Sequence, residues 1–188
     1  MNIHEFIDIG TVSVSSHLLR DSKFFSQSLE SPNIGKTISD TEIALDHIEL
    51  DRIHECIATT PVGEFHVAYR VQEWYGSEAP TLIFHHGSGK NPFDFGRYSS
   101  NSARRLFAAD QWNVPVNLVL IRAPFHDLSS LDYARGMGDL ADFVGMCATS
   151  TVLLDRITTL LFQRGCPQIG VSGISLGGWV TNLHHAFC

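Results

Sequence analysis

The feature that most constrains the fold is a glycine–serine turn near the end of the sequence. Gly173, Ser175 and Gly177 occupy alternate positions, a spacing typical of a very sharp turn from a strand into a helix, with the serine at its apex. A side chain at either glycine would collide with the neighbouring strand or helix. Residues 168–172 can form a short buried strand before the turn, and residues 179–183 can continue a helix after it. We therefore expect Ser175 at a helix N-terminus.

The composition is that of one globular domain. The chain has 188 residues, 44% hydrophobic and 18% charged, so a real core can be buried. A formal net charge of -7 argues against binding to nucleic acid or to an anionic membrane. The four cysteines are widely spaced and form no metal-binding motif, so free thiols and no metal site are expected. No signal peptide or bilayer-spanning run is recognised, which makes a cytoplasmic location the default expectation.

The order of the expected elements predicts an α/β domain. Residues 1–50 are interpreted as an N-terminal extension packed on a core formed by residues 51–188. Two strands open this core, and three short apolar runs follow that are typical of strands buried on both faces. The five segments are 56–59, 64–71, 81–84, 114–121 and 168–172. Helical segments separate the apolar runs, which favours parallel strands joined by right-handed crossovers. We therefore expect a mostly parallel sheet with flanking helices.

A long helical stretch precedes the last strand. It runs from Ser129 to Arg164, and Ser129 or Ser130 can cap its N-terminus. Unbroken, it would span roughly 50 Å at about 1.5 Å per residue, which is long for a small domain. A break is therefore expected near 136–138, where two glycines flank a methionine. Further helices are expected at 16–29 and 97–109.

Two loops are expected on the same rim of the sheet as Ser175. The first is the glycine-rich segment that follows the apolar run at 81–84, where His86 and Gly87 are candidates for lining a substrate pocket. The second holds His126 and Asp127, which are candidates for the same role. Functional groups in parallel sheets gather at the carboxyl ends of the strands. Neighbouring side chains in an extended loop point in different directions, so His126 and Asp127 are not expected to form a ready histidine–aspartate relay.

The segment His86-Gly87-Ser88-Gly89 and the turn at 173–177 together resemble the α/β-hydrolase superfamily, over roughly residues 53–188. The resemblance implies an incomplete α/β-hydrolase fold that hydrolyses an ester or related acyl group of a small molecule, without a cofactor. It implies that Ser175 is the nucleophile of a nucleophile elbow. The backbone N–H groups of Leu176 and Ser88 would then donate hydrogen bonds to the oxyanion.

The sequence departs from that family after the nucleophile. The family places its acid and its histidine later in the chain, but only 13 residues follow Ser175. His184 and His185 lie roughly 14 Å along the expected helix, too far from Ser175 for a hydrogen bond, and are interpreted as packing or surface residues. We therefore expect the N-terminal portion of a serine hydrolase, inactive by itself.

Other interpretations stay open. The chain can be a non-catalytic binding module that keeps the scaffold, because a fold does not fix a function. It can also be one half of a two-chain assembly, since the strand at 168–172 would leave an unpaired apolar edge that invites pairing with another chain. A nucleotide-binding domain is disfavoured, because no G-x-G-x-x-G or P-loop pattern follows any expected strand.

Overall fold

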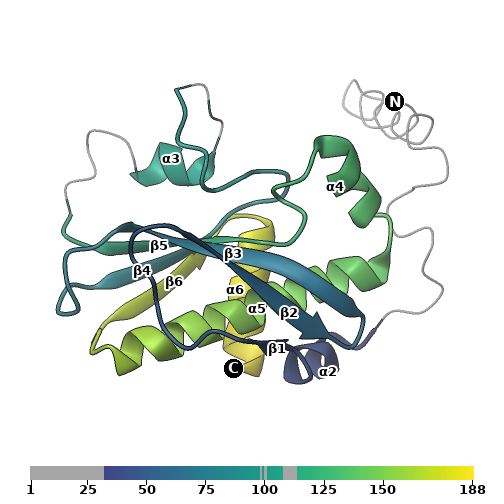
Figure 1. The fold of residues 1–188 in the computed structure, drawn as a ribbon, viewed down its shortest axis with the longest axis horizontal. Coiled ribbons are helices and arrows are strands. Elements are labelled where there is room, and N and C mark those ends of the chain that lie inside the picture. The colour runs from purple at the N-terminus through teal and green to yellow at the C-terminus, as the bar shows by residue number, and fades with distance from the viewer. Residues whose placement is uncertain (1–31, 98, 100, 108–113) are drawn as a thin grey trace, which may run out of the picture.

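Six strands form a single sheet in the part of the chain that the structure describes (Figure 1). The structure is a computed structural model that describes residues 32–97, 99, 101–107 and 114–188, so the helix expected at 16–29 lies outside the described residues. In space the strands follow the order β1-β2-β3-β5-β4-β6. Their bounds are β1 Glu42–Ile43, β2 Ile53–Thr60, β3 Gly63–Glu73, β4 Thr81–His85, β5 Asn117–Arg122 and β6 Ile169–Gly173.

The sheet is mixed, and the expected fold class of a mostly parallel α/β sheet is wrong. The pairs β1–β2, β2–β3 and β3–β5 are antiparallel, and only β4–β5 and β4–β6 are parallel. The sheet curls into a half-barrel. The antiparallel part comes from a long hairpin, because β2 has 8 residues and β3 has 11. The apolar runs indicate parallel pairing only among β4, β5 and β6, whereas β2 alternates between exposed and buried positions as antiparallel strands commonly do.

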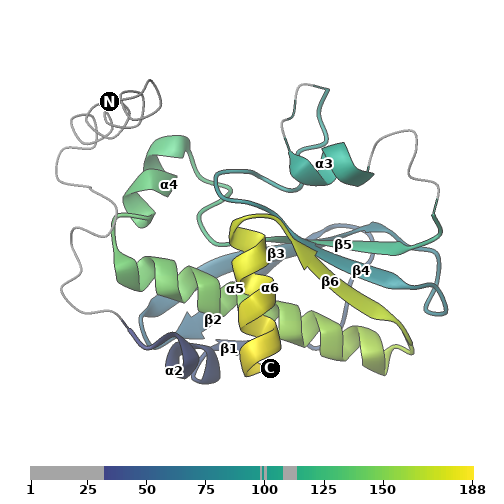
Figure 2. The same cartoon turned by 180° about the vertical axis from the view of Figure 1, so that it is seen from behind.

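Five helices accompany the sheet in the described residues. They are α2 Ile34–Ser39, α3 Ser102–Phe107, α4 Ser130–Gly136, α5 Leu140–Gln163 and α6 Leu176–Phe187. The expected break near 136–138 is confirmed, since α4 ends at Gly136 and α5 begins at Leu140. Ser129 caps α4, because its side chain accepts a hydrogen bond from the backbone N–H of Asp132. Figure 2 shows α6 running across α5 on one side of the sheet.

The main core lies between the sheet and α5. Its fully buried members include Ile83, Val119 and Ile121 from the strands and Leu154 and Leu161 from α5. Among the described helices, α5 alone has the length and composition to cross a membrane. Within the protein, 72% of its most apolar 18-residue stretch is buried. A helix at the centre of a core has the same two properties, and α5 is such a helix here.

The order of the strands determines what surrounds Ser175. β4 is flanked by β5 and β6, so the loops that follow β4 and β6 emerge side by side at the same end of the sheet. β6 is an edge strand that pairs only with β4 within the described residues. The helix α6 starts directly after this edge strand, and its buried Val180 joins the main core. Ser175 therefore sits between a sheet edge and a helix N-terminus.

Candidate active site

The backbone at Ser175 is held in a conformation that side chains rarely adopt. Its φ is 55° and its ψ is -112°. Among the described residues, Phe125 is the other residue besides glycine with a positive φ. Such a conformation costs on the order of 1–3 kcal/mol and persists only where the surroundings enforce it. The backbone at the apex of this turn is therefore strained.

Two glycines make the turn sterically possible. A Cβ at Gly173 would lie 2.2 Å from the carbonyl carbon of Gly177, and a Cβ at Gly177 would lie 2.2 Å from the backbone oxygen of His85. Real Cβ atoms essentially never come so close to backbone atoms. The first residues of α6 are thus pressed against the ends of both β6 and β4, and this contact fixes the position of Ser175.

A cleft of about 290 Å³ opens beside Ser175. Its lining consists of Ser88, Phe143, Ser175, Leu176 and Trp179. Phe143 from α5 and Trp179 from α6 meet edge to face, with ring centroids 6.0 Å apart and an angle of 74° between the rings. Trp179 is 61% exposed, so an apolar wall faces solvent next to the serine hydroxyl. Sequence reasoning did not find these two aromatic residues, because nothing in their local sequence separates them from core residues.

The two backbone groups expected as oxyanion donors border this cleft. The N–H groups of Ser88 and Leu176 have no hydrogen-bond acceptor among the described residues. Gly87 packs directly on the turn, since a Cβ there would lie 3.3 Å from the carbonyl oxygen of Ile174 and 3.6 Å from the Cβ of Ser175. Leu176 opens α6, and a helix N-terminus favours negative charge through its free N–H groups and its dipole. The loop after β4 and the start of α6 therefore contribute one residue each to the lining of the cleft, Ser88 and Leu176, and the backbone N–H of each has no acceptor in the described structure.

His86 shapes this loop rather than facing the cleft. It is fully buried. Its Nδ1–H donates to the backbone oxygen of Gly87 at 2.7 Å, and its Nε2 accepts from the backbone N–H of Ala123 at 3.0 Å. A carbonyl oxygen can only accept, so these two bonds require the neutral ring with its proton on Nδ1. With both nitrogens engaged, His86 is unable to serve as a base for Ser175 in this arrangement.

Three histidines form a buried stack beneath the loop. The rings of His85 and His86 are stacked with centroids 5.0 Å apart, and the ring of His126 meets His86 at 4.5 Å. Burial lowers the pKa of His85 to about 4. Burial, followed by the neighbouring His85 and His126, holds the pKa of His86 well below 6.5. Burial also lowers the pKa of His126, opposed by its hydrogen bond to the Pro124 carbonyl. All three rings are therefore neutral near pH 7.

His126 and Asp127 point in different directions, as expected for neighbours in a loop. His126 is buried, and its Nδ1–H donates to the backbone oxygen of Pro124 at 2.8 Å. Asp127 turns outward and lies 3.4 Å from Nη2 of Arg122, a guanidinium that also binds Glu55. Asp127 lines a separate hollow beside β3. Neither side chain lines the cleft beside Ser175.

No base reaches Ser175 in the described part of the chain. Among the residues that the structure describes, the exposed hydroxyl of Ser175 has no hydrogen-bond partner. The histidines on α6 are remote, as expected, because His184 faces α5 and lies 3.5 Å from a carboxylate oxygen of Asp155. A larger hollow of about 630 Å³ borders the C-terminal end of α5, but its lining carries no serine, histidine or carboxylate. The described residues thus place an exposed serine at a strained turn beside a cleft, with no base within hydrogen-bond reach of its hydroxyl.

One group of ionisable side chains was missed by sequence reasoning. Asp155 from α5 approaches His184 from α6 and Cys188, the residue that follows the last turn of α6, with potential metal-ligating atoms within 4.8 Å of one another. The four-residue spacing of His184 and Cys188 was visible in the sequence and places both on one helix face. The approach of Asp155 was not, because it depends on how α6 crosses α5.

No family model, no curated protein and no solved structure matches this chain.

Proposed function

We propose that Ser175 is the nucleophile of a serine hydrolase centre that acts on an ester or related acyl group of a small molecule. The single observation that carries this proposal is the backbone of Ser175, whose φ of 55° and ψ of -112° are enforced by contacts at Gly173 and Gly177. A strained serine at the start of a helix is how a nucleophile elbow presents its hydroxyl. The proposal rests on the two loops around the cleft and not on the class of the sheet.

The surroundings of the serine support acyl chemistry. Attack by its Oγ on a carbonyl carbon would place negative charge on the carbonyl oxygen. Ser88 and Leu176 line the same cleft, and their backbone N–H groups are the proposed donors to that oxygen. Removing one well-placed oxyanion donor typically costs roughly 3 kcal/mol in the transition state. The rings of Phe143 and Trp179 offer an apolar wall for the acyl or alcohol part of a substrate.

The absent base determines the activity expected of this chain alone. A serine hydroxyl is a poor nucleophile until an adjacent group takes its proton, and no such group lies beside Ser175 in the described residues. Little or no turnover is therefore expected without an added base. An oxyanion hole and substrate binding alone still give roughly 10³–10⁴-fold acceleration over water in serine proteases that have lost their triad.

A fluorophosphonate probe tests the proposal. The probe reacts with an activated serine, its phosphorus bonding to Oγ as fluoride leaves, and imidazole in solution can act as the base that the site lacks. We expect labelling that is weak in plain buffer, rises with imidazole concentration and disappears in Ser175→Ala. The matched control is Ser172→Ala, which removes another exposed hydroxyl three residues earlier on β6 and should label normally. Absence of labelling at every imidazole concentration would refute a nucleophilic role.

A second candidate function follows from the edge position of β6. Its outer side is unpaired within the described residues, and an unpaired strand edge can accept a strand from another polypeptide. In this alternative a second chain pairs with β6 and supplies the base. Sedimentation and labelling in the presence of candidate partner chains test it: assembly should increase Ser175 labelling without imidazole. If the probe never reacts but small molecules bind in the cleft, a non-catalytic binding module is favoured instead.

A further inference from the structure

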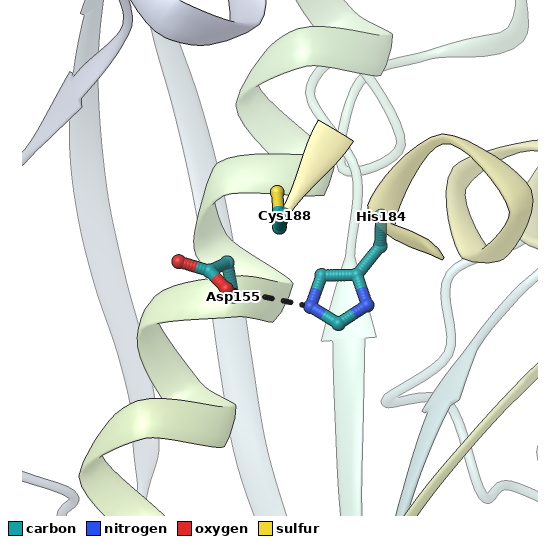
Figure 3. Close-up of side chains that lie close together, drawn as sticks. All are labelled: Asp155, His184 and Cys188. Atoms are coloured by element: carbon teal, nitrogen blue, oxygen red, sulfur yellow. Dashed lines mark ion pairs between the residues drawn. The ribbon is translucent and has the colours of Figure 1, made fainter. Parts of the chain in front are cut away.

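We propose that Asp155, His184 and Cys188 bind a zinc ion that links the C-terminal end of α6 to the middle of α5. Figure 3 shows the three side chains converging from the two helices. Their ligand atoms lie within 4.8 Å of one another. This cluster lies at the opposite end of α6 from Ser175, so the inference does not depend on the proposed hydrolase function.

Helix geometry brings the two ligands on α6 together. His184 and Cys188 are four residues apart, and residues at this spacing lie on the same face of a helix. The last turn is intact, because the backbone N–H of Cys188 donates to the backbone oxygen of His184 at 3.0 Å. That face packs on α5, where the side chain of Asp155 is 49% exposed. The pair on α6 is thus preorganised, and the carboxylate can move toward it.

Nε2 of His184 lacks a hydrogen-bond partner in the described structure, although it is buried. The nearest carboxylate oxygen, Oδ1 of Asp155, is 3.5 Å away, as the dashed line in Figure 3 marks, which is longer than a good N–H···O hydrogen bond. A buried nitrogen without a partner is costly. A metal ion between Nε2 and the carboxylate would satisfy both groups.

The set of ligands selects zinc among common biological cations. A thiolate, an imidazole and one carboxylate form a mixed sulfur, nitrogen and oxygen site, whereas magnesium and calcium prefer oxygen alone. Tetrahedral zinc bonds of about 2.0–2.3 Å place ligand atoms roughly 3.5 Å apart. Closing the present cluster to that size requires a shift of about 1 Å, which rotation of the exposed Cys188 and Asp155 can provide. A water molecule would complete the four ligands.

Charge and proton balance also fit. Zinc binds the thiolate form of a cysteine, so the Cys188 thiol gives up its proton when the metal binds. The S–Zn bond replaces the S–H bond and H⁺ is released to solvent, while His184 contributes a ring-nitrogen lone pair. The thiolate and the carboxylate then balance the two positive charges of the ion. Affinity should therefore increase with pH.

The experiment is a metal titration of the full chain under reducing conditions. Zinc is titrated in competition with a chromogenic chelator, and cobalt is used as a spectroscopic probe of thiolate ligation. We expect one zinc per chain, a higher melting temperature with zinc than with a chelator, and a near-ultraviolet thiolate–cobalt band. His184→Asn and Cys188→Ser should weaken binding more than about 100-fold, since loss of an outer partner of a metal ligand already costs roughly 10–100-fold.

The matched control is His185→Asn, which removes an exposed imidazole from the next position on α6 and should bind zinc like the unchanged chain. Binding that survives in both His184→Asn and Cys188→Ser would overturn the proposal, as would a cobalt complex of the unchanged chain that lacks the thiolate band. Because the cobalt spectrum is measured on the unchanged chain, the test does not depend on the variants remaining folded.

Discussion

The strained backbone of Ser175 leads to an unusual prediction: replacing this serine with glycine should give a more stable protein than replacing it with alanine. Both changes remove the hydroxyl, but alanine keeps a Cβ in a conformation with φ 55° and ψ -112°. That strain is on the order of 1–3 kcal/mol. Glycine relieves it, although its greater freedom in the unfolded chain costs roughly 0.5–1 kcal/mol relative to alanine. Ser175→Gly should therefore exceed Ser175→Ala by up to about 2.5 kcal/mol in free energy of unfolding.

Urea denaturation of the two variants measures this difference, and thermal unfolding provides a second reading at about 2–4 °C per kcal/mol for a chain of this size. The matched pair is Ser172→Gly and Ser172→Ala on β6, where the serine has no positive φ. There the order should reverse, because glycine weakens a strand. If Ser175→Ala proves as stable as Ser175→Gly, the backbone at the turn is not strained and the elbow interpretation loses its physical basis.

The remaining two predictions concern the histidine stack and the contact beneath the turn. Protonation of buried His85, His86 and His126 is disfavoured in the folded protein. The free energy of unfolding should therefore be constant above about pH 6.5 and fall toward pH 4. His85 alone, with a pKa of about 4, should lower the free energy of unfolding by roughly 2 kcal/mol between pH 7 and pH 5. Urea denaturation at several pH values checks this, and stability that rises on acidification would contradict it. Gly177→Ala should unfold or displace the turn, because its Cβ would lie 2.2 Å from a backbone oxygen. Gly170→Ala, whose Cβ would have its nearest contact at 3.9 Å, should change stability little. Circular dichroism and thermal unfolding compare the two variants, and a Gly177→Ala variant as stable as Gly170→Ala would argue against the close packing.

The turn itself was the most predictable part of the fold. Sequence spacing alone indicated a strand, a sharp turn and a helix around Ser175, because short-range sterics leave few alternatives for glycines at 173 and 177. The helix break at 136–138 and the cap at Ser129 were predictable for the same reason. Each of these features depends on residues only a few positions apart.

The class of the sheet was not predictable from the same patterns. Continuous apolar runs indicate burial on both faces, which occurs for β4 and β5 but not for β6, where half-buried and exposed residues alternate. Such runs also do not say how many antiparallel strands precede them. The direction of β3 against β5 is linked to how the chain reverses between residues 74 and 80, and no local sequence pattern specifies that reversal. The side-chain amide of Asn117 donates to backbone oxygens of Gly76 and Ala79 in that reversal.

The candidate site was predictable in its backbone and not in its side chains. Ser175, Ser88 and Leu176, which the motifs indicated, line one cleft, because chain position after two neighbouring strands is enough to bring these backbone segments together. The aromatic wall of Phe143 and Trp179 was missed, because it depends on how α5 and α6 cross. The expected pocket residues His126 and Asp127 lie away from the cleft, because His126 is drawn into the buried histidine stack.

The most direct measurement of the central claim is the site of fluorophosphonate modification, mapped by mass spectrometry with and without imidazole. Cleavage after Arg164 gives one tryptic peptide, residues 165–188, that holds both Ser172 and Ser175, and fragmentation of that peptide separates the two. The account predicts a single adduct on Ser175 whose yield increases with imidazole. An adduct on any other residue, or no adduct at any imidazole concentration, would contradict the claim that this turn presents a nucleophile.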